Sequence, residues 1–201
     1  MKTKKQLKDV FSGLSALWYQ ATELDLSDLT KALAIAPDYD LPVKVDSINL
    51  EQGDPTIDHY KVIGLPGDWV TSAESGDIEL SFRVPTKHTD VLEMAYGADA
   101  VKKNLTATVT TASSDSYTGT GLVLQQKKID GTFIFVNEDK TKLLVLTNTT
   151  LWAKPVLDQD AKGVFALDFN GSIESDGVNP DILFLEKSAS GSGSNHGPVN
   201  P

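Results

Sequence analysis

The sequence contains no cysteine, two methionines and three histidines, and it has no apolar run long enough to cross a membrane. Without cysteine there can be no disulfide, no thiolate metal ligand and no cysteine nucleophile. A membrane helix needs about 20 apolar residues in a row, and the start of the chain lacks even the run of about 7–15 that a secretion signal requires. We therefore expect no membrane anchor and no secretion signal.

An excess of positive charge is also missing, because the formal net charge is −10. The basic cluster lies at the start, where four lysines and Asp9 give the first ten residues a charge of +3 and leave −13 for the remainder. Binding to nucleic-acid phosphates requires a cationic surface, so the body of the chain is expected to repel DNA and RNA. We interpret residues 1–12 as a basic flexible arm and residues 188–201, rich in serine and glycine, as a flexible tail.

The region between these ends, residues 13–187, has the length of a single domain and a pattern dominated by β-strands. In its clearest strand, residues 78–84, apolar and polar residues alternate without exception. Further strands are expected at residues 15–22, 41–50, 59–63, 105–111, 121–128, 132–137, 142–147, 151–156, 164–173 and 182–186. About ten strands at this spacing are typical of a β-sandwich or barrel.

Two of these strands allow other interpretations. Residues 7–18 also fit a helical spacing, but Gly13 weakens a helix there, and we favour the strand at residues 15–22. The strand at residues 41–50 changes phase near Asp46, which predicts a bulge or bend.

The helical signal is strongest at residues 89–96, where Asp90 suits the first turn and Gly97 suits the end. Residues 26–35 predict either a short amphipathic helix or a turn, ended by Pro37.

Loops are predicted from glycine, proline and short polar residues. Gly53-Asp54-Pro55 is expected to be a loop, and Asp130-Gly131 predicts a hairpin between the strands at 121–128 and 132–137. A polar loop is expected at residues 111–118.

Catalytic and metal-binding motifs are incomplete. The histidines, at positions 59, 88 and 196, have neither metal-ligand spacing nor a glutamate partner. Asp54 and Asp68 could in principle act as paired carboxylates, but nothing in the sequence brings them together. We therefore expect no enzymatic activity and no cofactor.

One acidic loop has some features of a calcium site. Asp158-Gln-Asp-Ala-Lys-Gly163 begins like a calcium-binding loop, but Lys162 and Phe169 stand where oxygen ligands are required. We interpret this segment as an acidic hairpin turn that binds no metal.

Six stretches together resemble a known family. They are DSINLEQGDP at 46–55, GDIELSFRVP at 76–85, DVLEMAYG at 90–97, NEDKTKLLVL at 137–146, GVFALDFNGSIE at 163–174 and DILFL at 181–185. Over residues 15–187 this order resembles the major tail (tail tube) proteins of bacteriophages, which are related to the tube proteins of contractile injection and type VI secretion systems. The resemblance implies a mainly β fold, a β-sandwich or barrel-like subunit with one short flanking α-helix.

The resemblance also implies a function and partners. Such subunits form rings, commonly hexamers, that stack into a tube through which the genome passes without specific binding. The expected partners are copies of the chain itself and other tail proteins, such as the tape measure and the tail terminator. The expected location is the virion tail, after assembly in the cytoplasm of the bacterial host.

The surfaces expected to contact other copies are the Gly53 loop with Asp54 and Pro55, the loop at residues 112–117 with Tyr117, the N-terminal arm, and Trp69. The alternative function is a carbohydrate-binding β-sandwich module or a cell-surface accessory protein. It would use exposed aromatic residues, although packing in a core or an interface is favoured for Trp18, Trp69 and Trp152.

Overall fold

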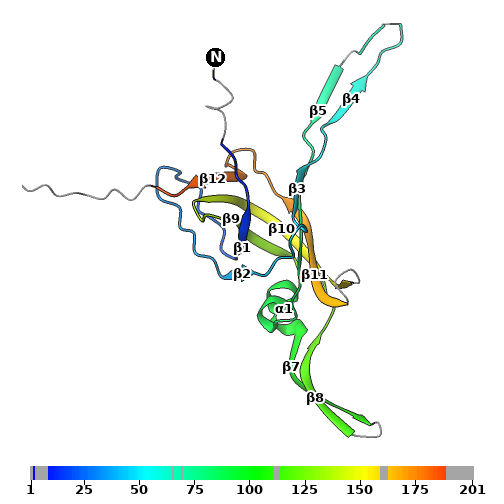
Figure 1. Ribbon diagram of the computed structural model, residues 1–201. Coiled ribbons are helices and arrows are strands. Elements are labelled where there is room, and N and C mark those ends of the chain that lie inside the picture. The colour runs from blue at the N-terminus through cyan, green and yellow to red at the C-terminus, as the bar shows by residue number, and fades with distance from the viewer. Residues whose placement is uncertain are drawn as a thin grey trace, which may run out of the picture.

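The computed structural model describes residue 2 and residues 9–64, 66–68, 70–110, 114–158 and 163–188. Over these residues the protein is mainly β, with antiparallel sheets and one short α-helix, α1 (Thr89–Tyr96), followed by the 3-10 turn η1 (Ala98–Ala100) (Figure 1). The strands are β1 (Leu14–Gln20), β2 (Tyr39–Leu41), β3 (Asn49–Gln52), β4 (Thr56–Tyr60), β5 (Val70–Glu74), β6 (Ile78–Val84), β7 (Val101–Thr110), β8 (Ser114–Leu122), β9 (Ile129–Asn137), β10 (Lys142–Asp158), β11 (Val164–Ile173) and β12 (Ile182–Glu186). The expected mainly β class is confirmed.

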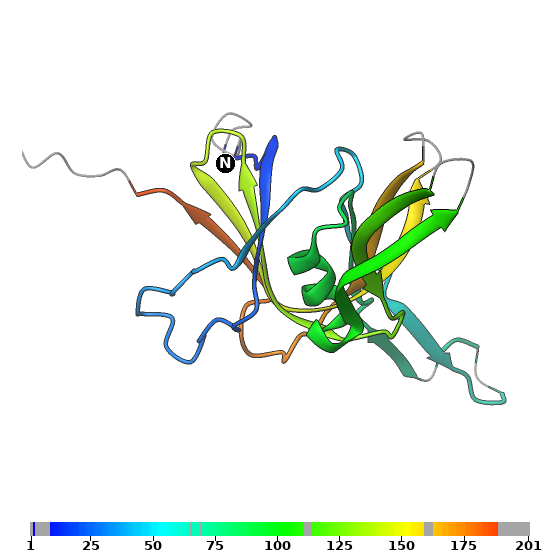
Figure 2. The same ribbon diagram turned by 90° about the horizontal axis from the view of Figure 1, so that it is seen from below.

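The main sheet has the strand order β2-β1-β9-β10-β11-β6-β3, and β12 also pairs with β10. The long strand β10 has two parts that pair with different strands. Its first part, from Lys142 to Leu146, lies between β9 and β12, and its second part, from Thr149 to Asp158, pairs with β11. The register with β9 shifts between these parts, and such irregularities bend a strand. The sheet therefore curves into two facing layers, with α1 between them (Figure 2).

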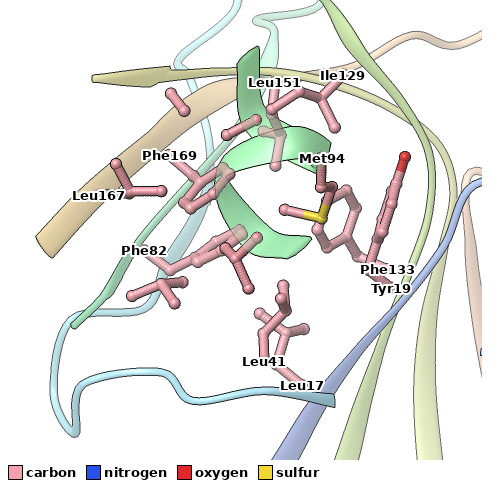
Figure 3. Packing of buried hydrophobic residues seen from close by; sticks show 14 of the residues in the cluster. Leu17, Tyr19, Leu41, Phe82, Met94, Ile129, Phe133, Leu151, Leu167 and Phe169 are labelled. Carbon is pink, nitrogen blue, oxygen red and sulfur yellow. The ribbon is translucent and has the colours of Figure 1, made fainter. Parts of the chain in front are cut away.

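The core lies on the inner side of this curved sheet. Phe82, Phe133 and Phe169 come from three different strands. The ring centroid of Phe82 lies 5.7 Å from that of Phe133 and 5.0 Å from that of Phe169. Figure 3 shows them gathered near Met94 of α1. Aromatic pairs at this spacing add to the stability gained from burying their area. The core therefore joins α1 to both layers of the sheet.

Helix α1 has clear ends. At its start the Nδ1 atom of His88 accepts a hydrogen bond from the backbone N–H of Asp90 at 3.4 Å, and it ends at Gly97, whose φ is +90°. Its buried residues, Val91, Leu92, Met94, Ala95 and Tyr96, cover the core. Tyr96 also donates its hydroxyl to the carbonyl of Ala153 in β10 at 3.3 Å, which ties the helix to the sheet.

A second, smaller cluster lies on the opposite face of the same sheet. Ile134 and Val136 of β9 and Val145 of β10 are buried there together with Leu24. Because β9 is covered on both faces, its sequence is continuously apolar from Phe133 to Val136 and does not alternate.

Several predicted elements have the observed bounds. The strands at 78–84, 164–173 and 182–186 and the helix at 89–96 agree residue for residue, and the strand interpretation of residues 15–22 is confirmed by β1. The predicted loop at Gly53-Asp54-Pro55 lies between β3 and β4.

The predicted Asp130-Gly131 hairpin is wrong. Both residues lie inside β9, and β8 pairs with β7. At Gly131 an added Cβ would lie 2.5 Å from the carbonyl oxygen of Gln20 and 2.8 Å from the Tyr19 ring. This glycine is therefore required by the close approach of β1, not by a turn.

Two other strand predictions are corrected. Residues 41–50 do not form one strand: the bend predicted near Asp46 is present as a turn, with Asp46 at φ +61°, and this turn separates β2 from β3. Of the two alternatives for residues 26–35, the turn is confirmed and the helix is wrong, because the carboxylates of Asp25 and Asp28 accept hydrogen bonds from the N–H groups two residues later, which favours turns. The strands predicted at 142–147 and 151–156 are one strand, β10.

Candidate assembly surfaces

Two hairpins project from opposite ends of the body (Figure 1). One is formed by β4 and β5 and the other by β7 and β8, and each is a separate two-stranded sheet. An isolated two-stranded ribbon is marginally stable in water because no further strand or helix covers its faces. Both hairpins are thus exposed features that gain stability if another surface covers them.

The β4–β5 hairpin is joined to the main sheet by a narrow crossing of two backbone segments. Gly53 donates its N–H to the carbonyl of Asp77 at 2.9 Å, and a Cβ on Gly76 would lie 2.2 Å from the Gly53 carbonyl oxygen. Only glycine fits at Gly76. The predicted interface residues Asp54 and Pro55 lie at this base and are exposed.

Beyond the base, every residue of β4 is exposed. The hairpin carries uncovered apolar side chains, with Ile57 and Tyr60 more than half exposed and Ile63, near the tip, 103 % exposed. Asp68 helps to fix the tip, since its Oδ2 lies 2.7 Å from Nδ1 of His59 and its Oδ1 lies 4.0 Å from Nζ of Lys61. Another predicted interface residue, Trp69, lies outside the described residues.

The β7–β8 ribbon has two chemically different faces. One face carries Leu105, Ala107 and Val109 of β7, and Tyr117 of β8 lies directly opposite Ala107. The other face consists of hydroxyl side chains in opposite pairs: Thr106 with Thr118, Thr108 with Ser116, and Thr110 with Ser114. A strand that alternates in this way normally buries its apolar face, but Leu105, Val109 and Tyr117 are exposed.

The loop predicted at residues 111–118 is wrong for its second part. Ser114 to Thr118 belong to β8 and pair with β7, because serine and threonine here fill the polar face of a ribbon. Residues 111–113 lie outside the described residues. Tyr117 is therefore a strand residue on the apolar face, and not a loop residue.

The main sheet also has open edges. Strand β12 pairs with β10 and, in the described part of the chain, with no other strand. Its residues Ile182–Glu186 include Phe184, which is 72 % exposed. Edge β3, by contrast, places Glu51 directly opposite Glu79, and both carboxylates are exposed. Charged side chains discourage pairing at an edge. Of these two edges, β12 is therefore the one more open to pairing with a strand of another chain.

The residues considered for chemistry are not brought into one site. His88 caps α1, His59 pairs with Asp68 on a hairpin, and His196 lies outside the described residues. Asp54 lies at the base of the β4–β5 hairpin, whereas Asp68 lies near its tip. Within the described residues no group of three or more histidine, aspartate or glutamate side chains could hold a metal ion.

Residues 159–162, which form most of the predicted acidic hairpin turn, lie outside the described residues. A groove of about 650 Å³ is lined by the start of β1, by residues 40–46 and by Ile48. Its hydroxyl group, Ser15 Oγ, donates to the carbonyl of Asn137 at 2.9 Å, and no histidine lines the groove. It therefore lacks the paired nucleophile and base of a hydrolytic site.

The tryptophans have different environments. Trp18 packs against the small cluster around Ile134. Trp152 of β10 is 41 % exposed and lies opposite Asn170 of β11.

None of the helices in the described ranges is long and apolar enough to cross a membrane.

Comparison of the chain with protein-family models, with curated proteins and with solved structures gives no match.

Proposed function

We propose that this protein is a structural subunit of a phage tail tube, which assembles with copies of itself into stacked rings that form a conduit for genome delivery. The observation that carries the proposal is the pair of exposed hairpins with uncovered apolar side chains at opposite ends of one body. A soluble monomer rarely leaves such surfaces open. A subunit held on both sides by other copies covers them.

Opposite placement of the hairpins favours contacts between different surfaces of successive copies. Such heterologous contacts generate rings if the rotation closes and filaments if it does not. Both products are needed for a tube: a closed ring around the lumen and repeated stacking along its axis. The resemblance in sequence to tail tube proteins favours a hexameric ring.

Strand β12 supplies a second kind of surface for the ring. An exposed edge strand offers a row of unpaired backbone N–H and C=O groups to another chain, and Phe184 adds apolar area beside it. We assign this edge to contacts within one ring.

The charge of the chain suits a conduit for DNA. With a net charge of −10, the assembled subunits would repel the phosphate backbone and let it slide without sticking. The proposed partners are other copies, the tape measure and tail terminator proteins and, transiently, the passing genome. The proposed location is the virion tail, reached after assembly in the host cytoplasm.

Light scattering on a size-exclusion column, followed by negative-stain electron microscopy, tests the proposal directly. Rings or hollow tubes at raised protein concentration are the expected result. A strict monomer over the whole concentration range, with no particles in the micrographs, would sink the tube function.

The exposed Trp152 supports a second candidate, a carbohydrate-binding module. Its indole lies on a sheet face beside Asn170, and sugar rings stack on such aromatic faces while amides bind their hydroxyls. A glycan array with the wild-type protein and a Trp152→Ala variant separates the two functions. Binding that depends on Trp152, by a protein that stays monomeric, favours the module.

A further inference from the structure

We propose that the protein binds a neutral oligosaccharide along a row of side chains that crosses the outer face of the layer formed by β10, β11, β6 and β3. This row, called the polar row below, consists of Trp152, Asn170, Ser81 and Asn49. The inference does not depend on the proposed tube function, because the polar row belongs neither to the hairpins nor to β12. It makes Trp152 one end of a defined site and gives the ligand a charge, a length and a direction.

The strand register places the four residues of the polar row on one line. Trp152 of β10 lies directly opposite Asn170 of β11. Asn170 lies opposite Ser81 of β6, and Ser81 lies opposite Asn49 of β3. Residues opposite each other in antiparallel strands share a face. The next residue before Asn170, Phe169, points into the core (Figure 3), and successive side chains alternate, so the polar row faces outward.

All four side chains of the polar row keep their hydrogen-bonding groups open to a ligand. Trp152, Asn170 and Asn49 are exposed, and Ser81 is half-buried. Within the described part of the chain none of these four side chains makes a hydrogen bond. Together they offer an indole donor, two amides that both donate and accept, and a hydroxyl. Sugar hydroxyls also donate and accept, so the polar row matches their chemistry.

Trp152 supplies the apolar contact at one end of the polar row. Its side chain is 41 % exposed, and an exposed aromatic face gains from covering the C–H groups on one side of a pyranose ring. Neighbouring strands lie about 4.8 Å apart, so the three steps from β10 to β3 make the polar row about 14 Å long. This length exceeds that of a single pyranose ring. The ligand is therefore an oligosaccharide that lies across the strands, with one sugar on Trp152.

A cleft beside the middle of the polar row sets the charge of the ligand. Its volume is about 330 Å³, a size typical of small-ligand sites, and Ser81 and Asn170 line it. The charged residues that line it are two cations and two carboxylates, so their formal charges cancel: Lys44, Arg83, Asp46 and Asp168. A cleft without net charge, in a chain with a net charge of −10, does not attract a polyanion. A neutral sugar is therefore favoured over a sulfated one.

Isothermal titration calorimetry tests the site with neutral probes, maltohexaose, cellohexaose and the hexamer of N-acetylglucosamine, and with a heparin hexasaccharide as the anionic probe. We expect the wild type to bind at least one neutral probe and not the heparin fragment. Trp152→Ala should weaken this binding at least about tenfold, and Asn170→Ala about two- to tenfold. Binding of heparin alone, or of none of the four probes, overturns the inference.

Matched variants show whether the loss is specific to the polar row. Trp152→Tyr keeps an aromatic face and should retain part of the affinity. Lys154→Ala and Ser172→Ala lie on the same face, two residues from Trp152 and Asn170, and should bind like the wild type. Melting temperatures confirm that each variant is folded. Equal affinity of Trp152→Ala and Lys154→Ala would overturn the inference.

The length of the probe tests the direction of the ligand. Asn49 lies at the opposite end of the polar row from Trp152, so Asn49→Ala should weaken binding of the hexasaccharide that binds the wild type but not of the corresponding disaccharide. An unchanged affinity for the hexasaccharide would contradict a ligand that crosses all four strands.

Light scattering on the same samples keeps this inference separate from the tube function. Trp152→Ala should form rings and tubes like the wild type, because the polar row belongs to none of the proposed assembly surfaces. Wild-type tubes that bind no sugar would overturn the sugar site and leave the tube function standing. A monomer that binds sugar through Trp152 would do the reverse.

Discussion

Arg83 of β6 and Asp168 of β11 lie directly opposite each other and form a two-pronged ion pair, with Nε to Oδ1 at 2.5 Å and Nη2 to Oδ2 at 3.0 Å. Both side chains are more than two-thirds buried. A paired guanidinium and carboxylate in this geometry is stronger than an exposed ion pair. It fastens two neighbouring strands of the layer from which the β4–β5 hairpin projects.

Loss of the Asp168 carboxylate should lower stability. In an Asp168→Ala variant the largely buried guanidinium of Arg83 loses its two hydrogen bonds to Asp168, and we expect the free energy of unfolding to fall by about 1–3 kcal/mol. Urea unfolding would show a lower midpoint with an unchanged slope. The control is Lys31→Ala, which breaks an exposed ion pair with Asp28 and should leave the urea midpoint nearly unchanged. Equal effects of the two variants would contradict this prediction.

Stability should also fall at alkaline pH because of Tyr19. Burial, together with the charges of Asp38 and Asp130 and the neighbouring Tyr39, raises the pKa of the Tyr19 hydroxyl to about 12. The unfolded chain ionises this group near its ordinary pKa of about 10. The contribution to stability is therefore complete below pH about 10 and is lost as the pH rises through about 12.

The variant Tyr19→Phe tests whether the Tyr19 hydroxyl causes this loss of stability at high pH. Near neutral pH it loses the hydrogen bond from the hydroxyl to the Asp130 carbonyl at 2.8 Å, and the expected cost is about 0.5–1.5 kcal/mol. The difference from wild type should shrink above pH about 10, as measured by urea unfolding across the pH range. The control Tyr60→Phe, on the exposed β4–β5 hairpin, should have little effect on the free energy of unfolding near neutral pH. A gap for Tyr19→Phe that stays constant up to pH about 12 would rule out the burial effect.

Substitution by alanine should destabilise the protein at Gly171 of β11 but have almost no effect at Gly119 of β8. At Gly171 of β11 a Cβ would lie 1.9 Å from the carbonyl oxygen of Thr150 and 2.8 Å from Cα of Leu151. Because backbone atoms must move, Gly171→Ala should destabilise the fold by about 1–3 kcal/mol or more. Gly119→Ala meets open space and should leave the melting temperature nearly unchanged. A melting temperature equally lowered in both variants would show that the clash at Gly171 does not matter.

Edge pairing through β12 should depend on the outward N–H of Phe184. Lys187 donates to the carbonyl of Thr141, and Thr147 donates to the carbonyl of Asp181. In an antiparallel pair the hydrogen-bonded positions alternate. The backbone N–H of Leu183 therefore points toward β10, and the backbone N–H of Phe184 points away from it. Phe184→Pro should therefore keep the monomer folded and abolish rings in light scattering. The matched control, Leu183→Pro, removes a bond to β10 and should destabilise the monomer itself. Rings formed by Phe184→Pro would exclude β12 as the ring edge.

Local patterns predicted the elements that obey a single rule. Strand β6 alternates because one of its faces lies on the core and the other is more accessible. Helix α1 has Asp90 in its first turn and Gly97 at its end. Neither element requires knowledge of a distant partner.

The errors arose where distant segments decide. Gly131 looked like a turn residue, yet its position depends on Tyr19 and Gln20, which are more than a hundred residues away. The choice of β7 as the partner of β8 is likewise not visible in the local sequence. The exposure of apolar side chains was also not predictable. Ile57 and Leu105 lie in strand-like patterns, and the local sequence does not reveal that these strands project away from the core.

Strand β10 belongs to both layers of the body, one through Lys142–Leu146 and the other through Thr149–Asp158. A pull applied to either layer is therefore transmitted to the other along a continuous covalent chain, and not only through side chains that can slide. If the hairpins carry load when a tail bends, this strand keeps the two halves of each subunit from parting.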